Sequence, residues 1–599
     1  MDDQKNLIMA AVLSFLVILG WTFFFAPPPP EPVAEQAASG GVSEGGSSGV
    51  AGDVVGAGDQ TGLNREAALG KSERIRVETP SLTGSISLRG GRIDDLHLTD
   101  YRETLDEGAD TVTLLSPTGA EHPFYAVYGW LNAEGGAAKT PGPNTDWRVE
   151  SGGVLSPGAP LTLAWDNGEG LTFRRMIEVD EKFMFTVGQS VENRTGETIN
   201  LVPYGYVARQ GEPETINFFI LHEGAIGVFD GELKELDYDD MTDLPPAGPS
   251  VRQEQVTATE DGFIGFTDKY WMATIAPGHG QGFSASYKYV QRASGSEYRT
   301  EAVLPVQEVA AGATTSVSTF LFAGAKEFEA IHNYQETLQI DRFDDSIDWG
   351  WFFFLTKPIF KLLLWVQGMI GNMGWSIIVL TLIIKAALFP LAYKSYVSMS
   401  KMKKLQPEME KIKERVGDDK QKMQKEMMEL YKREKANPAA GCLPILLQIP
   451  IFFSLYKVLF VTIEMRHAPF ILWIEDLSAP DPTSILNLFG LLPWDTPSQE
   501  SFFFIFSVGV FPILMGVTMW MQQKLNPAPT DKMQAQIFAW MPWIFMFMLG
   551  TFASGLVIYW VANNLITFIQ QYAIMRSQGV DVDFFGNVKK SFKRKPKES

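Results

Sequence analysis

The chain has 599 residues, of which 45% are hydrophobic, and a net charge of −20. Its mean hydropathy of −0.01 is too low for a protein lying wholly in a membrane and too high for an ordinary soluble protein of this length, so we expect a large extramembrane part joined to a membrane part. One cysteine, Cys442, excludes an intrachain disulfide, and six scattered histidines do not indicate a metal site, so no cofactor is predicted.

The first 26 residues predict an uncleaved transmembrane anchor. Residues 7–25 are continuously apolar and long enough to cross a bilayer. A proline run at 27–30 follows, where a signal peptide would have a small-residue cleavage site. Residues 27–72 are rich in Gly, Ala, Ser and Pro and offer almost no large apolar side chain to bury, which predicts a flexible tether.

Residues 73–343 predict one large antiparallel β-sandwich domain. Short β-rich runs alternate there with Gly, Pro, Asn and Asp at the spacing typical of such a sandwich. The runs are residues 81–88, 171–179, 183–191, 201–208, 263–275 and 315–322, with a short helix at 326–334. Acidic residues are abundant in the domain, but no pair among them is typical of an acid and base catalyst.

Residues 344–372 predict an amphipathic helix in the membrane interface. Three tryptophans and two lysines, Trp349, Trp351, Trp365, Lys357 and Lys361, suit that position. A full transmembrane span is the competing interpretation, and it would place the later basic loop on the opposite side of the membrane.

A five-helix membrane core is expected over residues 373–576, which with the anchor makes six spans. The spans are residues 7–25, 375–393, 443–463, 502–521, 537–549 and 556–572. Basic residues between Lys394 and Lys435 and in the tail 577–599 predict that these segments and both termini face the cytoplasm. The β domain then stands on the far side of the membrane.

Lys385 lies near the middle of the apolar segment 375–393. A central lysine costs about 2.5 to 3.5 kcal/mol on insertion scales, so such a cation is by default a candidate for a functional site. Snorkelling or pairing with a buried acid is the plainer alternative, although no other apolar span offers a central Asp or Glu. The more specific hypothesis is a water-filled recess that admits an anionic group.

The loop 394–436 predicts an antiparallel helical hairpin with an apolar seam. Its apolar residues recur at spacings of three and four, with a turn at 417–418; they are Met402, Leu405, Met409, Ile412, Val416, Met423, Met427 and Leu430. The charged exterior either only fixes topology or docks ribosomes and targeting factors. The tail adds Lys589, Lys590, Lys593, Arg594, Lys595 and Lys597, within reach of lipid headgroups or ribosomal RNA.

Several long stretches resemble a known family. They are MDDQKNL, GNMGWSIIVLTLIIKAALFPL, GDDKQKMQKEMMELYKREKANPAAGCLPILLQIPIFFSLY, RHAPFILWIEDLSAPDP and FASGLVIYWVANNLITFIQQ. They are similar to the YidC membrane protein insertases of Gram-negative bacteria, within the broader Oxa family. The resemblance implies a multi-pass protein of the inner membrane, with a periplasmic β-supersandwich of galactose-mutarotase type. It also implies a hydrophilic groove that is open to the cytoplasm and lipid and closed to the periplasm.

Carried over by position, the family's groove cation falls on Lys385, where many members have arginine. A lysine keeps the charge but loses the bidentate fork, which favours attraction by charge over planar recognition. Thr381 and Gln448 match groove positions, with interhelical hydrogen bonding as the alternative. Tyr559 and Trp560 match an aromatic pair where many relatives have two tyrosines, and core packing is the alternative for both.

The resemblance implies an insertase and chaperone for nascent inner-membrane proteins, alone or with the Sec translocon, and not an enzyme. A small-solute transporter with an intramembrane lysine is the alternative function, but the internal repeats or paired broken helices of transporters are not seen. A carbohydrate-active enzyme in the β domain is a third possibility, which the acidic residues alone do not support.

Overall fold

The computed structural model describes residues 62–216, 220–292, 295–417, 419–434, 443–497, 501–526 and 532–580. The predicted anchor, nearly all of the tether and the tail after residue 580 lie outside these residues. The chain divides into two compact units, Met1–Val55 and Gly56–Ser599, and every described residue belongs to the second.

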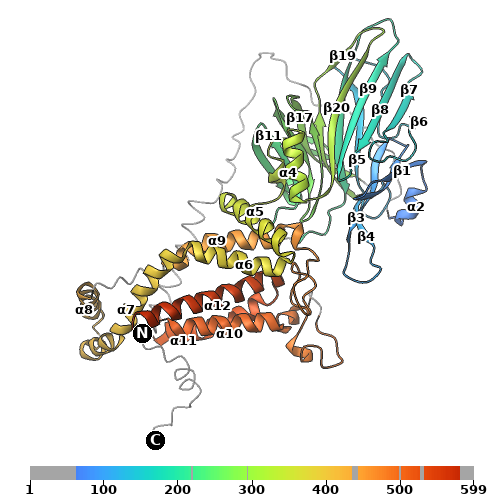
Figure 1. Ribbon diagram of the computed structural model, residues 1–599. Coiled ribbons are helices and arrows are strands. Elements are labelled where there is room, and N and C mark those ends of the chain that lie inside the picture. Colours follow the sequence, from blue (N-terminus) through green and yellow to red (C-terminus); the bar gives the residue numbers. More distant parts are fainter. Residues whose placement is uncertain are drawn as a thin grey trace, which may run out of the picture. The chain divides into compact units, whose positions relative to one another are not determined.

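The β domain consists of two large antiparallel sheets (Figure 1). The 11-stranded sheet has the order β1-β2-β3-β5-β10-β18-β17-β14-β13, with β4 on β3 and β19 on β10. Its strands are β1 (Arg74–Glu78), β2 (Leu82–Ser87), β3 (Arg92–Arg102), β4 (Thr111–Leu115), β5 (Phe124–Asn132), β10 (Ile199–Gln210), β13 (Pro246–Gly248), β14 (Val251–Ala258), β17 (Phe283–Arg292), β18 (Gly295–Val303) and β19 (Gln307–Val309).

The second sheet is 9-stranded and has the order β12-β11-β15-β16-β20-β9-β8-β7-β6. Its strands are β6 (Arg148–Ser151), β7 (Leu161–Asp166), β8 (Leu171–Val179), β9 (Met184–Asn193), β11 (Gly224–Phe229), β12 (Glu232–Asp237), β15 (Gly262–Thr267), β16 (Trp271–Pro277) and β20 (Thr314–Ala325). Two short helices, α2 (Arg65–Leu69) and α3 (Tyr238–Thr242), flank the sheets.

Alternation of buried and exposed side chains along the strands explains why the two sheets pack together. Along β9 nearly every second residue is fully buried, as the period of a strand with one core-facing side requires. Aromatic side chains from both sheets, including Trp130, Phe173 and Phe266, fill a common core. The predicted β-sandwich is therefore confirmed. The expected single run 263–275 is two strands, β15 and β16, joined by a turn at 268–270.

An aromatic chain connects the sandwich to the first long helix. The short helix expected at 326–334 is α4 (Phe328–Thr337), and a 3-10 turn, η1 (Phe343–Ser346), leads to α5 (Phe353–Ile370). Phe328 packs on Trp349 and on Phe360 of α5, with ring centroids 5.8 Å and 5.2 Å away. Trp349 is buried and its Nε1 donates to the carbonyl of Asp344 at 2.7 Å, so this tryptophan anchors the junction rather than facing lipid.

The predicted span 375–393 is not one helix. The chain bends by 69° between α6 (Met373–Ala387) and α7 (Phe389–Val416). Pro390 lies in the first turn of α7, where its missing N–H is tolerated, but inside a continuous helix its ring would clash with the carbonyl four residues earlier. Lys385 therefore lies in the last turn of α6 and not at the centre of a straight span.

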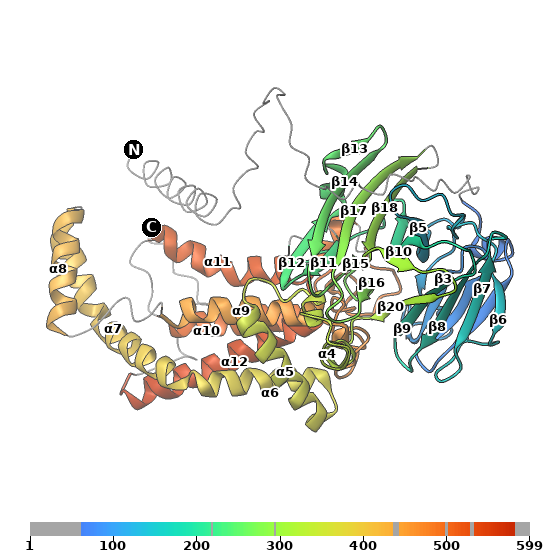
Figure 2. The same ribbon diagram turned by 90° about the horizontal axis from the view of Figure 1, so that it is seen from above.

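The remaining helices are α8 (Lys420–Arg433), α9 (Leu443–Val461), α10 (Val510–Leu525), α11 (Lys532–Leu549) and α12 (Ser554–Ser577). The expected span 502–521 is wrong at its start, because residues Phe502–Phe506 form a 3-10 turn, η5, and the α-helix begins at Val510. Helices α6, α9 and α10 pack around α12 (Figure 2).

Among the described residues, only α5 is by itself long and apolar enough to cross a membrane. A second span is added if α6 and α7 are counted together as one bent segment. The interfacial position of α5 and the count of six spans stay predictions.

Helices α7 and α8 pack against each other as a hairpin in the described residues. Helix α7 ends at Val416 and is followed by Gly417, whose positive φ of 63° is one that glycine favours, and α8 folds back. Leu405, Met409 and Leu430 form a buried cluster, with Met402 and Met427 packed against it. The spacing of the apolar seam therefore identified the face on which the two helices meet.

Candidate functional site

Lys385 lies in a cleft between three helices. Its α6 neighbours there are Thr381, Ile384 and Leu388. The other walls come from α9 and α12 and are formed by Gln448, Ile451, Leu455, Tyr559 and Asn563. The cleft holds about 260 Å³ of space not filled by atoms, part of it open to solvent. It is lined by both apolar and polar side chains, and Lys385 is the one lining residue that carries a charge.

Neutral oxygens hold the ammonium group of Lys385. Its Nζ donates to Oγ1 of Thr567 at 2.9 Å and to Oε1 of Gln448 at 3.3 Å. The amide of Gln448 also donates from Nε2 to Oδ1 of Asn563 at 2.8 Å. These hydrogen bonds connect α6, α9 and α12 around the ammonium group. Within the described ranges, no carboxylate lies at ion-pair distance from Lys385.

The structure brings four of the five predicted site residues to this cleft. Thr381 lines it, although its hydroxyl donates to the carbonyl of Ile377 in its own helix at 2.7 Å. Gln448 makes the interhelical bonds that were the alternative to a groove role, and it makes them inside the cleft. Tyr559 is buried and lines the wall.

Trp560 does not line this cleft. Its ring stacks on Phe452 with centroids 5.5 Å apart and meets Phe552 edge-on at 6.2 Å. The packing interpretation of Trp560 is therefore the one that its described contacts favour. Successive residues of a helix point about 100° apart, so a neighbour of the cleft-lining Tyr559 is turned to another face of α12.

Sequence reasoning missed Asn563 and Thr567. Both belong to a polar stripe on α12 in which Tyr559, Asn563, Thr567 and Gln571 recur at every fourth position. Residues four apart lie on one face of a helix, so a polar stripe at this spacing in an apolar segment was an available signal. Gln571 continues the stripe by donating to Oδ1 of Asn526 at 2.9 Å.

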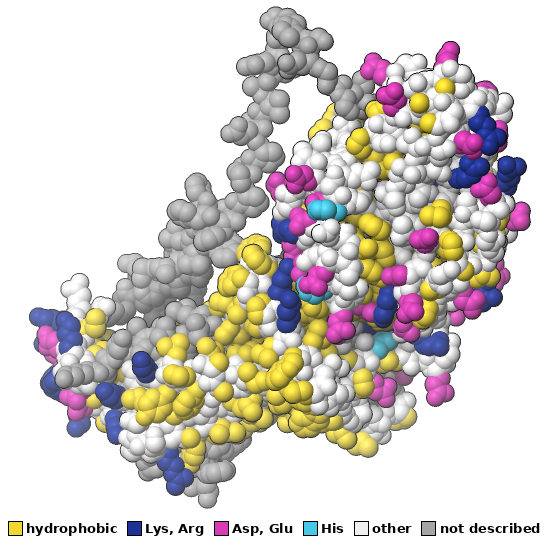
Figure 3. Space-filling view, turned by 45° about the horizontal axis from the view of Figure 1, so that its top comes forward, with side chains coloured by type: hydrophobic (Ala, Val, Ile, Leu, Met, Phe, Trp, Pro, Cys, Tyr) yellow, Lys and Arg dark blue, Asp and Glu magenta, His cyan; other side chains and the backbone are white. Residues whose placement is uncertain are grey.

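Charged side chains are unevenly distributed over the visible surface of the molecule (Figure 3). Hydrophobic side chains cover much of the visible surface of the helical part, whereas Asp and Glu are spread over the β domain (Figure 3). A cation held only by neutral groups in a surrounding of low dielectric attracts an anion more strongly than a lysine in water would. The site therefore offers one unneutralised positive charge beside an apolar surface.

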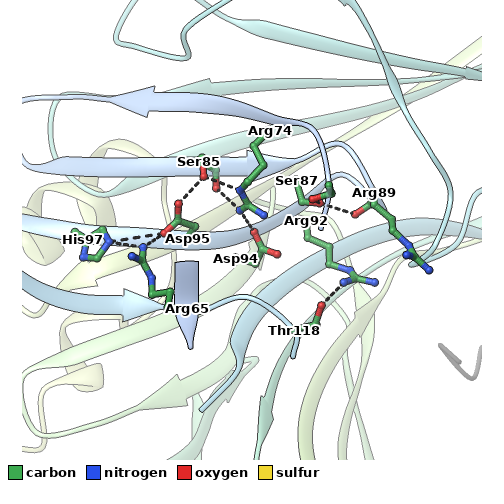
Figure 4. Close-up of polar contacts among 11 residues, drawn as sticks. Arg65, Arg74, Ser85, Ser87, Arg89, Arg92, Asp94, Asp95, His97 and Thr118 are labelled. Atoms are coloured by element: carbon green, nitrogen blue, oxygen red, sulfur yellow. Dashed lines mark hydrogen bonds and ion pairs between the residues drawn. The ribbon is translucent and has the colours of Figure 1, made fainter. Parts of the chain in front are cut away.

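A second polar cluster lies in the β domain, on β2, β3 and their neighbours (Figure 4). Asp95 pairs with Arg65, and Asp94, which is almost fully buried, pairs with Arg74. Burial raises the pKa of Asp94, while Arg74 lowers it. Because each carboxylate has an arginine partner, the cluster is suited to hold α2 and β1 against the sheet and lacks a free acid and base pair. The described residues contain no group of three or more acidic, His or Cys side chains that could hold a metal ion.

Comparison with known proteins covers both halves of the chain. Residues 74–362 match the family described as "YidC periplasmic domain", and residues 365–580 match "60Kd inner membrane protein". A membrane protein insertase YidC from Paracoccus denitrificans (strain Pd 1222) is 57% identical over 100% of this chain and 98% of its own. One from Ruegeria sp. (strain TM1040) is 60% identical over 85% of this chain and 84% of its own.

Solved structures give weaker likenesses. An active YidC insertase crystal structure with the first transmembrane domain resolved is 17% identical, covers 84% of this chain and 93% of its own, and has a TM-score of 0.34. A galactose mutarotase related enzyme from Lactobacillus acidophilus is 10% identical over 42% of this chain and 97% of its own, with a TM-score of 0.29. TM-scores this low give no support to the predicted mutarotase-type fold of the β domain. The sequence identity over the full length is what decides, and it places this chain in the family of YidC membrane protein insertases.

Proposed function

We propose that this protein inserts membrane proteins by admitting a polar segment of the client into the cleft at Lys385. The observation that carries the proposal is that Lys385 is bonded to neutral Thr567 and Gln448, with no carboxylate among the residues that line the cleft. An acidic tail or short acidic loop of a nascent chain supplies the missing anion. The protein acts as an insertase and as a chaperone for inner-membrane proteins, and clients reach it directly or from the Sec translocon.

The position of Lys385 along α6 suits a cleft entered from the cytoplasm. The first turn of α6 lies at the β-domain end, where Asn372 donates to the carbonyl of Phe470. Lys385 lies about 18 Å further along the helix axis, one turn before the bend into the hairpin. With the hairpin cytoplasmic and both termini on the same side, a polar segment needs to cross only the remaining part of a ~30 Å core.

The periplasmic end of the cleft is blocked by packing. Gly555 and Ser554 at the start of α12 donate to the carbonyls of Leu477 and Ala479, which closes the loop after α9 over that end. Ile377, Leu380 and Leu459 are fully buried in the same region. This packing supports entry of water to the cation from the other side only, which is the asymmetry that the proposed mechanism requires.

Burial of the client's own apolar helix supplies the driving force. Each Å² of apolar surface removed from water contributes about 25 cal/mol, so a transmembrane segment releases far more free energy than the transfer of a short tail costs. Exposed apolar side chains on α11, among them Ile537, Trp540 and Ile544, offer a continuous face along which the segment passes into lipid. No nucleotide is needed for this step.

The hairpin α7–α8 is the proposed docking surface for ribosomes and targeting factors. Lys and Arg side chains gather at this end of the molecule (Figure 3). Ion pairs of Arg415 with Glu426 and of Arg433 with Glu408 hold its two helices together while many lysines stay exposed. Exposed positive charge on a rigid arm suits long-range attraction to ribosomal RNA.

Site-specific photocrosslinking to a stalled nascent chain tests this function. A photoreactive residue in place of Ile451 or Leu455, on the cleft wall, is expected to capture an inserting client with an acidic tail. The same residue in place of Leu105, exposed in the β domain, is the control and is expected to capture none. Equal capture at both positions, or none in the cleft, overturns the proposal.

A further inference from the structure

The loop between α9 and α10 presents a large apolar surface that the insertion mechanism does not use. Residues 485–494, here called the apolar outer loop, contain six exposed large side chains. They are Ile485, Leu486, Leu488, Phe489, Leu491 and Trp494, of which Leu491 is 83% exposed. No charged residue occurs from Pro482 to Trp494. An uncharged exposed surface of this kind in a folded protein indicates an interaction site.

Most backbone amides of residues 485–492 donate hydrogen bonds within the protein. The amides of Leu488, Phe489, Leu491 and Leu492 donate to carbonyls within residues 484–488, and that of Ile485 donates to the carbonyl of Val508. Side-chain oxygens of Ser484 and Asn487 accept from the amides of Leu486 and Gly490. Even the indole Nε1 of Trp494 donates to the carbonyl of Leu486, at 3.0 Å.

Such internal bonding matters because lipid offers no partner for a free amide. Unsatisfied backbone groups cost several kcal/mol each in hydrocarbon, which is why irregular loops are ordinarily kept out of it. In a loop that faces water, water can form hydrogen bonds with the same backbone groups instead. Exposed leucines over an internally bonded backbone thus suit contact with acyl chains.

Backbone conformation points the same way. Leu488 and Phe489 have φ of 50° and 59°, and Gly490 follows with φ of 91°. Left-handed conformations at two bulky residues in succession are unfavourable and need support from their surroundings. The hydrogen bonds just described hold this turn, and its consequence is that Leu488, Phe489 and Leu491 stay exposed instead of folding onto the core.

The length of α10 leaves room for the loop in the membrane. Its 16 residues span about 24 Å, short of the ~30 Å hydrocarbon core. The segment before α10 is apolar but not α-helical, and Oγ of Ser507 in it donates to Oγ of Ser484 of the loop at 2.8 Å. The loop and η5 therefore lie at the depth in the membrane that a longer α10 would have reached.

The loop lies on the same side as the β domain. Arg466, in the same connection between α9 and α10, donates to the carbonyl of Arg102 on β3 at 2.6 Å, and Glu464 accepts from the amide of Phe328. Next to the loop, Phe506 packs on Phe547 of α11 with centroids 6.3 Å apart, so its apolar surface continues onto the exposed face of α11.

We propose that the apolar outer loop is a membrane-inserted element whose partner is the outer leaflet, with Leu488, Phe489 and Leu491 in the boundary between headgroups and acyl chains. Trp494 takes the headgroup level, the position that tryptophan favours. The loop fixes the depth of the short helix α10 in the bilayer on the side away from the cytoplasm.

Depth-resolved quenching on the full chain in lipid nanodiscs tests this inference. In a Cys442→Ser background, Leu491→Cys carries an environment-sensitive NBD label. The label is expected to be quenched by phosphatidylcholine with a nitroxide at acyl carbon 5, less by one with a nitroxide at carbon 12, and hardly by iodide. The matched control is Val306→Cys, also apolar and exposed but in the β domain, where iodide quenches and the nitroxide lipids do not.

Two outcomes overturn the proposal. Iodide quenching at position 491 as strong as at position 306, without quenching by either lipid, would show that the loop faces water. A label shielded from iodide in native membranes but open to it in nanodiscs of the purified protein would show that a protein partner, and not lipid, covers the loop. A second label at Leu488→Cys repeats the measurement if the variant at position 491 folds poorly.

Discussion

The Nζ of Lys385 lies 2.9 Å from Oγ1 of Thr567, which joins the last turn of α6 to α12 although the two residues are 182 positions apart in the sequence. The bond places the charge at a helix junction and not on one isolated helix. The neutral oxygens of Thr567 and Gln448 hold the ammonium group at this junction.

We expect Lys385→Arg to keep function and Lys385→Ala or Lys385→Glu to weaken insertion of clients with acidic tails. Arginine retains the charge, alanine removes it, and glutamate repels the tail. Complementation of a depleted strain, with client insertion scored by protease protection, measures the effect.

The control for this series is Lys71→Glu, which reverses an exposed charge just before β1, outside both the cleft and the hairpin. It is expected to leave insertion of the same clients unchanged. Full growth and normal insertion with Lys385→Glu would contradict the proposed role of the positive charge in the cleft.

Thr567→Val is expected to lower the thermal midpoint and to reduce insertion of acidic-tail clients only. The change removes one of two neutral acceptors from a largely buried ammonium group, and hydrogen bonds between membrane helices contribute roughly 0.6 to 2 kcal/mol. Thr567→Ser should restore both properties because it keeps the hydroxyl.

Thr518→Val is the matched control for Thr567→Val. Thr518 is also buried and accepts a hydrogen bond from Asn564 of α12 at 3.4 Å, whereas Thr567 accepts from Lys385. It should affect stability without selecting among clients. If the two valine variants impair the same clients equally, the role of Thr567 at the cation is only structural.

The sequence predicted local periodic features well and tertiary ones poorly. Alternation in β8 and β9 and the seam of Leu405 and Met409 are read along one element, so their burial could be predicted. The apolar run at 502–506 resembles the start of a helix, but its neighbours Ser507 and Val508 bond to the loop at 484–485, and these long-range bonds override helix propensity.

The candidate site shows the same division. Lys385 could be identified from the sequence alone, because a single charge within an apolar segment is apparent without any tertiary contact. Asn563 and Thr567 did not, because a threonine or asparagine in a membrane helix gains meaning only from the partner that it meets.

Deleting residues 74–306 is expected to leave insertion largely intact, because the cleft and the hairpin lie elsewhere in the chain. Residues 315–343 must be kept, since Phe343 packs on Phe322 of β20 and the α4 residue Phe328 packs on Phe360 of α5. Complementation by a variant shown to be stably expressed measures this.

The matched comparison extends the deletion through residue 343. It should destabilise the membrane part by exposing Phe360 and Trp349, which are buried in the full chain. Loss of viability with the shorter deletion at normal expression would contradict the assignment of insertion to the helices.

Stability of the junction should depend on pH through Glu464, which follows α9. Burial raises the pKa of Glu464 from 4.5 to about 7. The folded state thus binds this proton more tightly than the unfolded state does, so the stabilisation is complete below about pH 4.5 and is lost as pH rises to about 7. We expect the thermal midpoint of the purified protein to fall across that window.

Glu464→Gln is the control, because it keeps an oxygen for the amide of Phe328 and cannot ionise. The difference between the two pH profiles should amount to about 1 to 3 kcal/mol. Parallel profiles for the two proteins would show that Glu464 ionises normally.

The last prediction concerns the basic tail, whose charges lie outside the described residues. Replacing Lys589, Lys590, Lys593, Arg594, Lys595 and Lys597 with glutamine should weaken co-sedimentation with ribosomes, most visibly at low salt, because counterion release makes binding to RNA depend on salt. Clients inserted after translation should be hardly affected. A variant with arginine at all six positions keeps the charge and should bind as before. If the glutamine variant binds ribosomes unchanged at every salt concentration, the tail serves only to hold the C-terminus in the cytoplasm, and docking falls to the hairpin alone.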